Sequence, residues 1–239
     1  MIKVILHLAK IIIAATAALL FASCTAINGS GNVTTENRKV EGTFTKVSVS
    51  GGLEAYISQG NVGEITVETD DNLQQYIKTE VSGGELKIYT DKSISPSKAT
   101  NIRITLPVIE AVSSAGGSTV KGKTVFKSNA ILLESSSGSN LEVNVSAVKI
   151  DAESSSGSTL NVTGTADELI AESSSGSTLN AGGLTAKNVD ADASSGSTIN
   201  TKPVEKLTAE ASSGSHVGYI KTPSSLKTDV SSGGSVSQE

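Results

Sequence analysis

Acidic side chains recur at one fixed place in the second half of the sequence, four residues before the central glycine of a repeated Ser-Gly-Ser phrase. If the repeats stack, neighbouring carboxylates lie about 4.8 Å apart and repel each other by about 1 kcal/mol per pair even in water. A hard cation such as Ca²⁺, which takes oxygen ligands, would relieve that repulsion. The alternative is a solvated acidic face that keeps a β-rich protein soluble. The residues of this acidic column are Glu134, Glu153, Glu172, Asp192, Glu210 and Asp229.

The sequence offers few other groups for catalysis. After residue 24 it contains one histidine, His216, and two arginines, Arg38 and Arg103. Hydrolytic and lyase sites need clustered carboxylates with a cation, or a nucleophile beside a base, whereas the many serines recur as structural positions. His216 replaces the Thr or Asn of other repeats, and we expect it to be a solvated surface residue. The sequence therefore predicts no catalytic residue, no cofactor and no other metal site, with a carbohydrate-active β-helix enzyme as a remote alternative.

These residues are set in an internal repeat. The phrase AESSSGSTLNV at 152–162 returns at 171–181 with one change, and from Gly138 onward the central glycines follow at steps of 19, 19, 20, 18 and 19 residues. Aliphatic residues stand seven before and three after each glycine, with Val120 filling the latter role in the first unit, and alanine stands five before it in most repeats. Such odd offsets give an alternation of period two, which is typical of a strand with one buried face. The central glycines are Gly116, Gly138, Gly157, Gly176, Gly196, Gly214 and Gly233.

A strand pattern that repeats about every 19 residues predicts a single-domain, all-β, parallel β-helix (β-solenoid) in which each turn pairs with the next. Glycine admits the backbone angles that a corner needs, so the glycines from Gly138 to Gly214 are expected to be turn positions. Residues 38–108 alternate less regularly, with strands expected at 46–58, 64–69, 84–90 and 101–107 and a short helix over 70–78. We expect this less regular N-terminal half to cover one end of the solenoid.

The first residues predict export. Lys3 and Lys10 flank the start of a 12-residue apolar run at 11–22, which ends in LLFASC at the only cysteine, Cys24. This is the length of a signal-peptide core and too short for a membrane span. We interpret 1–23 as a lipoprotein signal peptide, Cys24 as the lipidated residue, 24–37 as a polar tether and 38–239 as the folded domain. An ordinary cleaved signal with an incidental cysteine is the alternative.

The net charge of the chain indicates which classes of partner it can bind. The net charge is −5, and it becomes −7 without the leader, which carries Lys3 and Lys10 and no acid. Nucleic-acid binding would call for a basic patch, so we expect no nucleic-acid partner. The predicted location is the cell envelope, lipid-anchored in the outer membrane and facing either the periplasm or the surface.

Several segments in order resemble the head GIN domain family, the heads of adhesins common in Bacteroidetes lipoproteins. They are FTKVSVSGGLEAYISQG (44–60), ITVETDDNLQQYIKTEV (65–81), LKIYT (86–90) and IRITLPVIEAVSSAGGS (102–118), followed by the Ser-Gly-Ser repeats. The resemblance implies a right-handed parallel β-helix and an adhesin-like role with a glycan or protein ligand, and it supplies no catalytic residues to carry over. A structural envelope spacer or a periplasmic protein without a dedicated ligand remains the alternative function.

Overall fold

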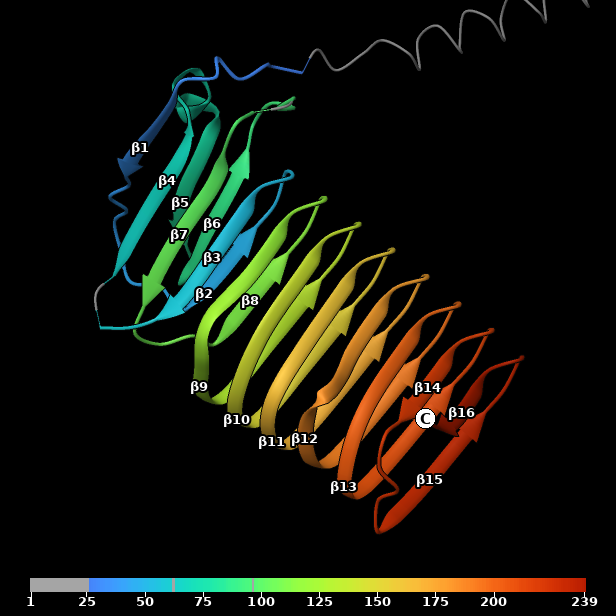
Figure 1. Cartoon of the computed structure of the whole chain (residues 1–239). Coiled ribbons are helices and arrows are strands. Elements are labelled where there is room, and N and C mark those ends of the chain that lie inside the picture. Colours follow the sequence, from blue (N-terminus) through green and yellow to red (C-terminus); the bar gives the residue numbers. More distant parts are fainter. Residues whose placement is uncertain (1–25, 62, 96) are drawn as a thin grey trace, which may run out of the picture.

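The computed structural model describes residues 26–61, 63–95 and 97–239, so the predicted signal peptide and Cys24 lie outside the described residues. The chain coils into a long, flattened β-solenoid whose rungs follow one another along a single axis (Figure 1). Within the described residues the one helical element is short, and every other regular element is a strand. The prediction of an all-β parallel β-helix is therefore confirmed.

Five long strands form the regular part of the solenoid. Each runs along one face, bends, and returns along the other face before a tight corner leads to the next rung (Figure 1). Neighbouring strands pair in parallel, and the register places Leu160 beside Leu141 on one side and Leu179 on the other. The strands are β9 (Thr119–Ser135), β10 (Asn140–Ser154), β11 (Thr159–Ser173), β12 (Thr178–Ala193) and β13 (Thr198–Ala211).

The odd-offset columns form the core, as the alternation predicted. The aliphatic residues three positions after the turn glycine are fully enclosed from Leu141 to Val217. Burial of one such side chain contributes roughly 1.5–3 kcal/mol, and no rung could enclose it alone. At the far end the chain forms β14 (His216–Tyr219), β15 (Ser225–Val230) and β16 (Ser235–Gln238). Val217 on β14 is still enclosed, whereas Leu226 on β15 is exposed and Val236 on β16 is only partly buried.

Each corner is a two-residue turn with positive φ at both central residues. Between β11 and β12 the central residues are Ser175 (φ 55°) and Gly176 (φ 69°), closed by a 3.3 Å bond from the Ser177 N–H to the Ser174 carbonyl. This is the type I′ pattern, and Gly138, Gly157, Gly196 and Gly214 occupy the same position at φ 70–74°. The sequence pattern identified the glycine but not the strained serine before it.

The first corner corrects the alignment of the repeat. The Gly117 N–H donates to the Ser137 carbonyl just as the Gly138 N–H donates to that of Ser156, so the counterpart of Gly138 is Gly117. The sequence alignment on Gly116 was therefore one residue off. A second glycine in this corner takes the place of the positive-φ serine, which made the two positions indistinguishable from the sequence.

The serine that follows each glycine is buried and binds the rung before it. The Ser158 hydroxyl donates to the Ser135 carbonyl at 2.6 Å, and the Ser177 hydroxyl lies 2.8 Å from the Ser154 carbonyl. Both serines are 2% exposed. A buried hydroxyl needs such a partner, so the Ser-Gly-Ser phrase joins rungs through side chains as well as backbone.

The N-terminal half is stacked in an order that differs from its order in the chain. Strands β2 (Lys46–Val49) and β3 (Glu54–Gln59) form a rung with a Gly-Gly corner. This rung lies between β8 (Ala111–Ser114) with β9 on one side and β6 (Glu85–Thr90) with β7 (Thr100–Leu106) on the other. Residues 85–106 are therefore farther from the regular rungs than residues 46–59, although they come later in the chain.

Antiparallel strands close this end, as expected for a cap. Strand β5 (Ile77–Ser82) pairs with β6, and β4 (Glu64–Asp70) lies between β7 and β1 (Val33–Asn37). Strand β1 falls inside 24–37, so part of the segment interpreted as a tether is folded against β4.

The expected helix is a short 3₁₀ turn. It is η1 (Asp71–Tyr76), and residues 77 and 78 of the predicted helix belong to β5. Asp70 precedes the turn without a capping bond, because its carboxylate accepts the Lys98 N–H instead at 3.1 Å.

Candidate functional site

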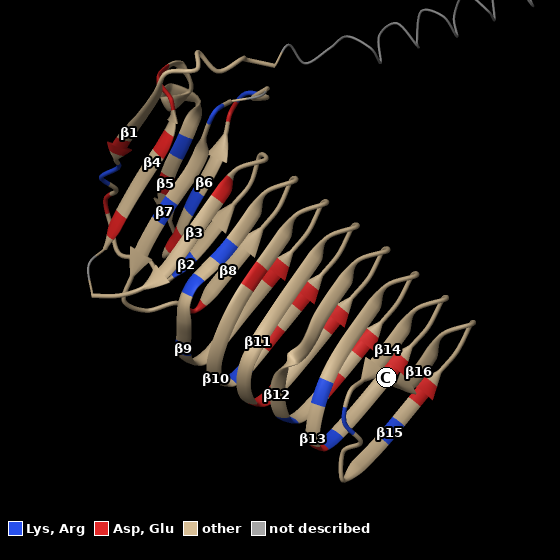
Figure 2. Cartoon of the chain, viewed as in Figure 1, with Lys and Arg blue, Asp and Glu red and all other residues tan. Residues whose placement is uncertain are grey.

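The acidic column forms one row across the rungs. The parallel register places Glu153 directly between Glu134 and Glu172, and the row continues to β15 (Figure 2). A groove of about 290 Å³ runs beside it, lined by its first four members and by small corner residues. None of the described residues that line this groove is basic. The small serines at the corner are what leave room for it.

The negative charge of the carboxylates along the groove is not neutralised by ion pairs among the described residues. Among the described residues, no member of the acidic column makes an ion pair. The pKa of Glu153 is raised, first by partial burial and then by the charges of Glu134, Asp151 and Glu172. Glu134 accepts a hydrogen bond from the Ser113 hydroxyl, which occupies the column position on the preceding rung. The groove therefore presents concentrated negative charge that favours cationic groups.

The column does not gather its carboxylates around one point. Within the described parts of the chain, no three His, Cys, Asp or Glu side chains are arranged to hold a metal ion together. Stacking at one residue per rung spreads the carboxylates along a line, whereas Ca²⁺ takes six to eight converging oxygens. The Ca²⁺ hypothesis thus depends on rearrangement of the column or on ligands from elsewhere.

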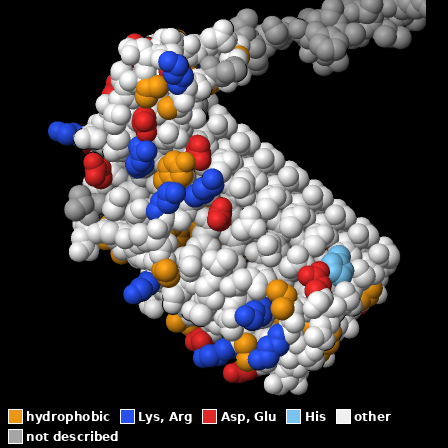
Figure 3. Space-filling model, in the orientation of Figure 1, with side chains coloured by type: hydrophobic (Ala, Val, Ile, Leu, Met, Phe, Trp, Pro, Cys, Tyr) orange, Lys and Arg blue, Asp and Glu red, His pale blue; other side chains and the backbone are white. Residues whose placement is uncertain are grey.

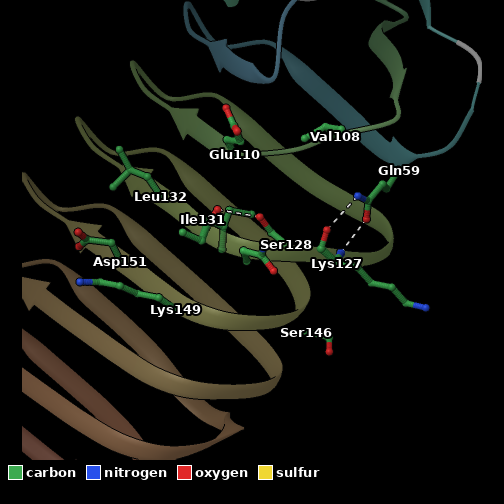
Figure 4. A pocket seen from close by; sticks show the side chains of 12 residues that line it. Gln59, Val108, Glu110, Lys127, Ser128, Ile131, Leu132, Ser146, Lys149 and Asp151 are labelled. Atoms are coloured by element: carbon green, nitrogen blue, oxygen red, sulfur yellow. Dashed lines mark hydrogen bonds between the residues drawn. The ribbon is translucent and has the colours of Figure 1, made fainter.

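A hollow of about 850 Å³ lies where the N-terminal cap meets the regular rungs (Figure 4). Its wall is mixed in chemistry, with the exposed apolar side chain of Val108 close to Glu110 and Lys127. Gln59 holds the middle of β9: its amide accepts from the Lys127 N–H at 2.7 Å and donates to the Lys127 carbonyl at 3.0 Å.

Two polar groups of this hollow are engaged in the fold. The Ser128 hydroxyl donates to the Ala130 carbonyl at 2.7 Å, so no base activates it. The Lys149 ammonium lies 3.8 Å from the Glu168 carboxylate. A nucleophile needs a base within hydrogen-bond reach, and this wall does not provide one for Ser128.

The opposite outer face is flat and uncharged over most of its length. Thr and Asn side chains follow one another in register along it, and the space-filling view shows few charged or hydrophobic side chains there (Figure 3). Asn161, Asn180 and Asn200 lie in register on adjacent rungs, and the Asn180 amide donates to Asn161 at 3.4 Å. His216 lies in the Thr row, bonded to Ser235 at 2.9 Å, with Glu239 at 3.5 Å.

One cluster was not expected from the sequence. Strands β3, β7 and β9 bring Tyr56, Arg103 and Lys121 side by side on the outer face of the cap. Two sequence features could have indicated this cluster. Tyr56 stands at an outward-facing position of the alternating segment EAYIS, and two lysines stand close together in the KGK triplet at 121–123. Because residues 46–59 join the stack out of sequence order, the pattern could not show that these segments are neighbours.

Stacked rungs with flat polar faces and a capped end define the class of protein: a β-solenoid of the kind that presents extended surfaces for binding. The chain belongs to the head GIN domain family. The family described as "Putative auto-transporter adhesin, head GIN domain" matches residues 43–223. The resemblance predicted from the sequence is thus confirmed.

Solved structures from Bacteroides and Parabacteroides have this fold. A putative adhesin from Bacteroides fragilis is 21% identical with a TM-score of 0.83; the alignment covers 90% of this chain and 100% of that one. A putative lipid binding protein and a putative adhesin, both from Parabacteroides distasonis, are 18% and 14% identical, with TM-scores of 0.74 and 0.75 and the same coverage. At such identities the likeness shows the fold alone. A search of curated proteins found no match.

Proposed function

We propose that the protein is a non-catalytic, lipid-anchored component of the cell envelope whose solenoid is an adhesin-like interaction module. The observation that carries the proposal is the combination of head GIN family membership with long, flat outer faces that repeat from rung to rung. Such faces suit an extended partner, because each rung offers the same groups at one spacing. The ligand class proposed is a glycan or a protein, with no nucleic acid.

The anchor is proposed at Cys24, with 1–23 as the signal peptide and the residues before Ile27, which pairs with Ile94, as the link to the folded domain. Support comes from the apolar run, the small residues before the only cysteine and the absence of a disulfide partner. Within the described residues, no helix is long and apolar enough to cross a membrane. The outer membrane is the proposed location.

Attachment of cells tests the proposal. A strain lacking the protein should bind host matrix or partner cells more weakly, and wild-type protein should restore binding. The Cys24→Ser variant should be made and folded but found outside the membrane fraction, and it should fail to restore attachment. Unchanged attachment in the deletion strain together with an altered envelope would favour the alternative, a structural spacer without a dedicated ligand.

A further inference from the structure

Tyr56, Arg103 and Lys123 line a hollow of about 540 Å³ on the outer face of strands β3, β4, β7 and β9. The register places Arg103 on one side of Tyr56 and Lys121 on the other. The Lys123 ammonium lies 4.5 Å from the centroid of the Tyr56 ring. Figure 3 shows this part of the surface as a gathering of charged and hydrophobic side chains beside the uncharged face of the rungs. An aromatic wall and cations thus meet in one depression.

Two carboxylates near Tyr56, those of Glu54 and Glu68, already accept hydrogen bonds from other side chains. The Tyr56 hydroxyl donates to Glu54 at 2.7 Å, and Arg103 bonds Glu68 at 2.8 Å. The Glu54 bond raises the pKa of Tyr56, so the phenol stays neutral at physiological pH. The Arg103 bond is the main cause of the lowered pKa of Glu68.

Arg103 and Lys121 each pair with a carboxylate, whereas Lys123 contacts the ring of Tyr56. Among the described residues it makes no ion pair with a carboxylate. A cation–π contact at an exposed site is worth only about 0.5–1 kcal/mol, and it leaves the three ammonium N–H groups available to a ligand. Arg103 likewise has five N–H donors, only part of which Glu68 takes. The hollow therefore holds two prepositioned cations with donors to offer.

The rest of the lining suits a polyhydroxylated ligand. Hydroxyls of Ser58, Thr66 and Thr105, the amide of Asn101 and the carboxylate of Glu64 border the same hollow. Convergent polar groups around one aromatic wall are typical of sites that bind small polar ligands. The mixture of hydroxyl, amide and carboxylate provides both donors and acceptors for sugar hydroxyls.

We propose that this hollow binds a sugar unit carrying a carboxylate, as in an acidic polysaccharide. The sugar carboxylate pairs with Lys123 and Arg103, the sugar ring lies against Tyr56, and its hydroxyls bond the polar lining. The inference rests on the proposed function, since it names the ligand class of the adhesin-like module. A neutral glycan would leave the Lys123 ammonium without a counter-charge.

Binding of polygalacturonate by the purified full chain tests the proposal, with dextran as the neutral probe, in affinity electrophoresis and calorimetry. We expect wild-type protein to bind polygalacturonate and not dextran. Loss of a charge-assisted hydrogen bond weakens binding by about tenfold or more, so Lys123→Ala should do so and Lys123→Arg should retain most of the affinity. Tyr56→Ala should also weaken binding.

The matched control is Lys187→Ala, which removes an exposed lysine that is ion-paired to Asp167 at 2.6 Å on the regular rungs. It should bind as wild type does, and unchanged circular dichroism should show that each variant is folded. No binding of polygalacturonate, equal binding of dextran, or full affinity in Lys123→Ala would overturn the proposal. If cells that carry Tyr56→Ala still attach normally, this hollow is not the ligand site, but the adhesin-like function stands. If cells that lack the whole protein still attach normally, the adhesin-like function is refuted, whatever the sugar-binding measurements show.

Discussion

The buried serine after each turn glycine should matter more than the exposed serine before it. Ser177 is 2% exposed, and its hydroxyl oxygen lies 2.8 Å from the Ser154 carbonyl and 2.9 Å from the Ser173 hydroxyl. Ser175, two residues earlier, is exposed and makes no side-chain hydrogen bond among the described residues. Ser177→Ala and Ser175→Ala therefore remove the same atom from one turn in two different settings.

The expected cost follows from those contacts. Each lost hydrogen bond is worth about 0.5–1.5 kcal/mol net, so Ser177→Ala should destabilise the protein by about 1–3 kcal/mol. A larger loss is not expected, because the Ser154 carbonyl keeps its bond from the Ser174 N–H at 3.0 Å. For a chain of this length the thermal midpoint should fall by about 2–4 °C per kcal/mol. Ser175→Ala should stay within about 0.5 kcal/mol of wild type.

Urea unfolding and thermal melting, both followed by circular dichroism, measure the free energy of unfolding and the thermal midpoint of each variant. Solenoids can unfold rung by rung, so the midpoints of the two variants are compared under identical conditions. Equal stability of the two variants, or a greater loss in Ser175→Ala, would show that the serine bonds between rungs do not hold the corner.

Four further outcomes are expected. Leu169→Ala should cost about 2–5 kcal/mol in urea unfolding, whereas Leu226→Ala, in the same column but 43% exposed, should cost under about 1 kcal/mol; equal costs would contradict the assigned core. Gly164→Ala should lower the thermal midpoint more than alanine at any turn glycine, because its Cβ would meet the Val145 carbonyl oxygen while turn positions have open space. Glu153→Gln should raise the midpoint at pH 7 in low salt and lose this effect near pH 4, since a raised folded-state pKa destabilises only above the unfolded value; an effect independent of pH would refute the repulsion. Ca²⁺ and Mg²⁺ at equal millimolar concentration should shift the midpoint equally by screening, and a shift specific to Ca²⁺ would instead establish a site in the acidic column.

The regular rungs could be predicted because each obeys one local rule. The alternation predicted that Leu160 faces the core and that Glu153 faces outward. The period of about 19 residues predicted that the rungs stack, and the register shows this stacking. The positive φ of Ser175 could not be predicted, because serine rarely adopts that conformation and only the stack of identical corners imposes it.

The cap was predictable in content but not in arrangement. Its strands alternate as expected, yet no local rule specifies that β2 lies between β6 and β8 and β3 between β7 and β9. Tyr56 therefore meets Arg103 through a long-range pairing that a single sequence does not encode in its periodicity. For the same reason β1 appeared to be part of a tether, since its five polar-rich residues depend on β4 for their order.

Whether the solenoid faces outward on intact cells tests the central claim most directly, because an adhesin-like module must be reachable by its partner. Intact cells are treated with a membrane-impermeant amine reagent, and modification of Lys123 and of other exposed lysines is measured by mass spectrometry beside a periplasmic marker. The account predicts labelling of these lysines while the marker stays unlabelled. Labelling that appears only after the outer membrane is permeabilised would contradict it.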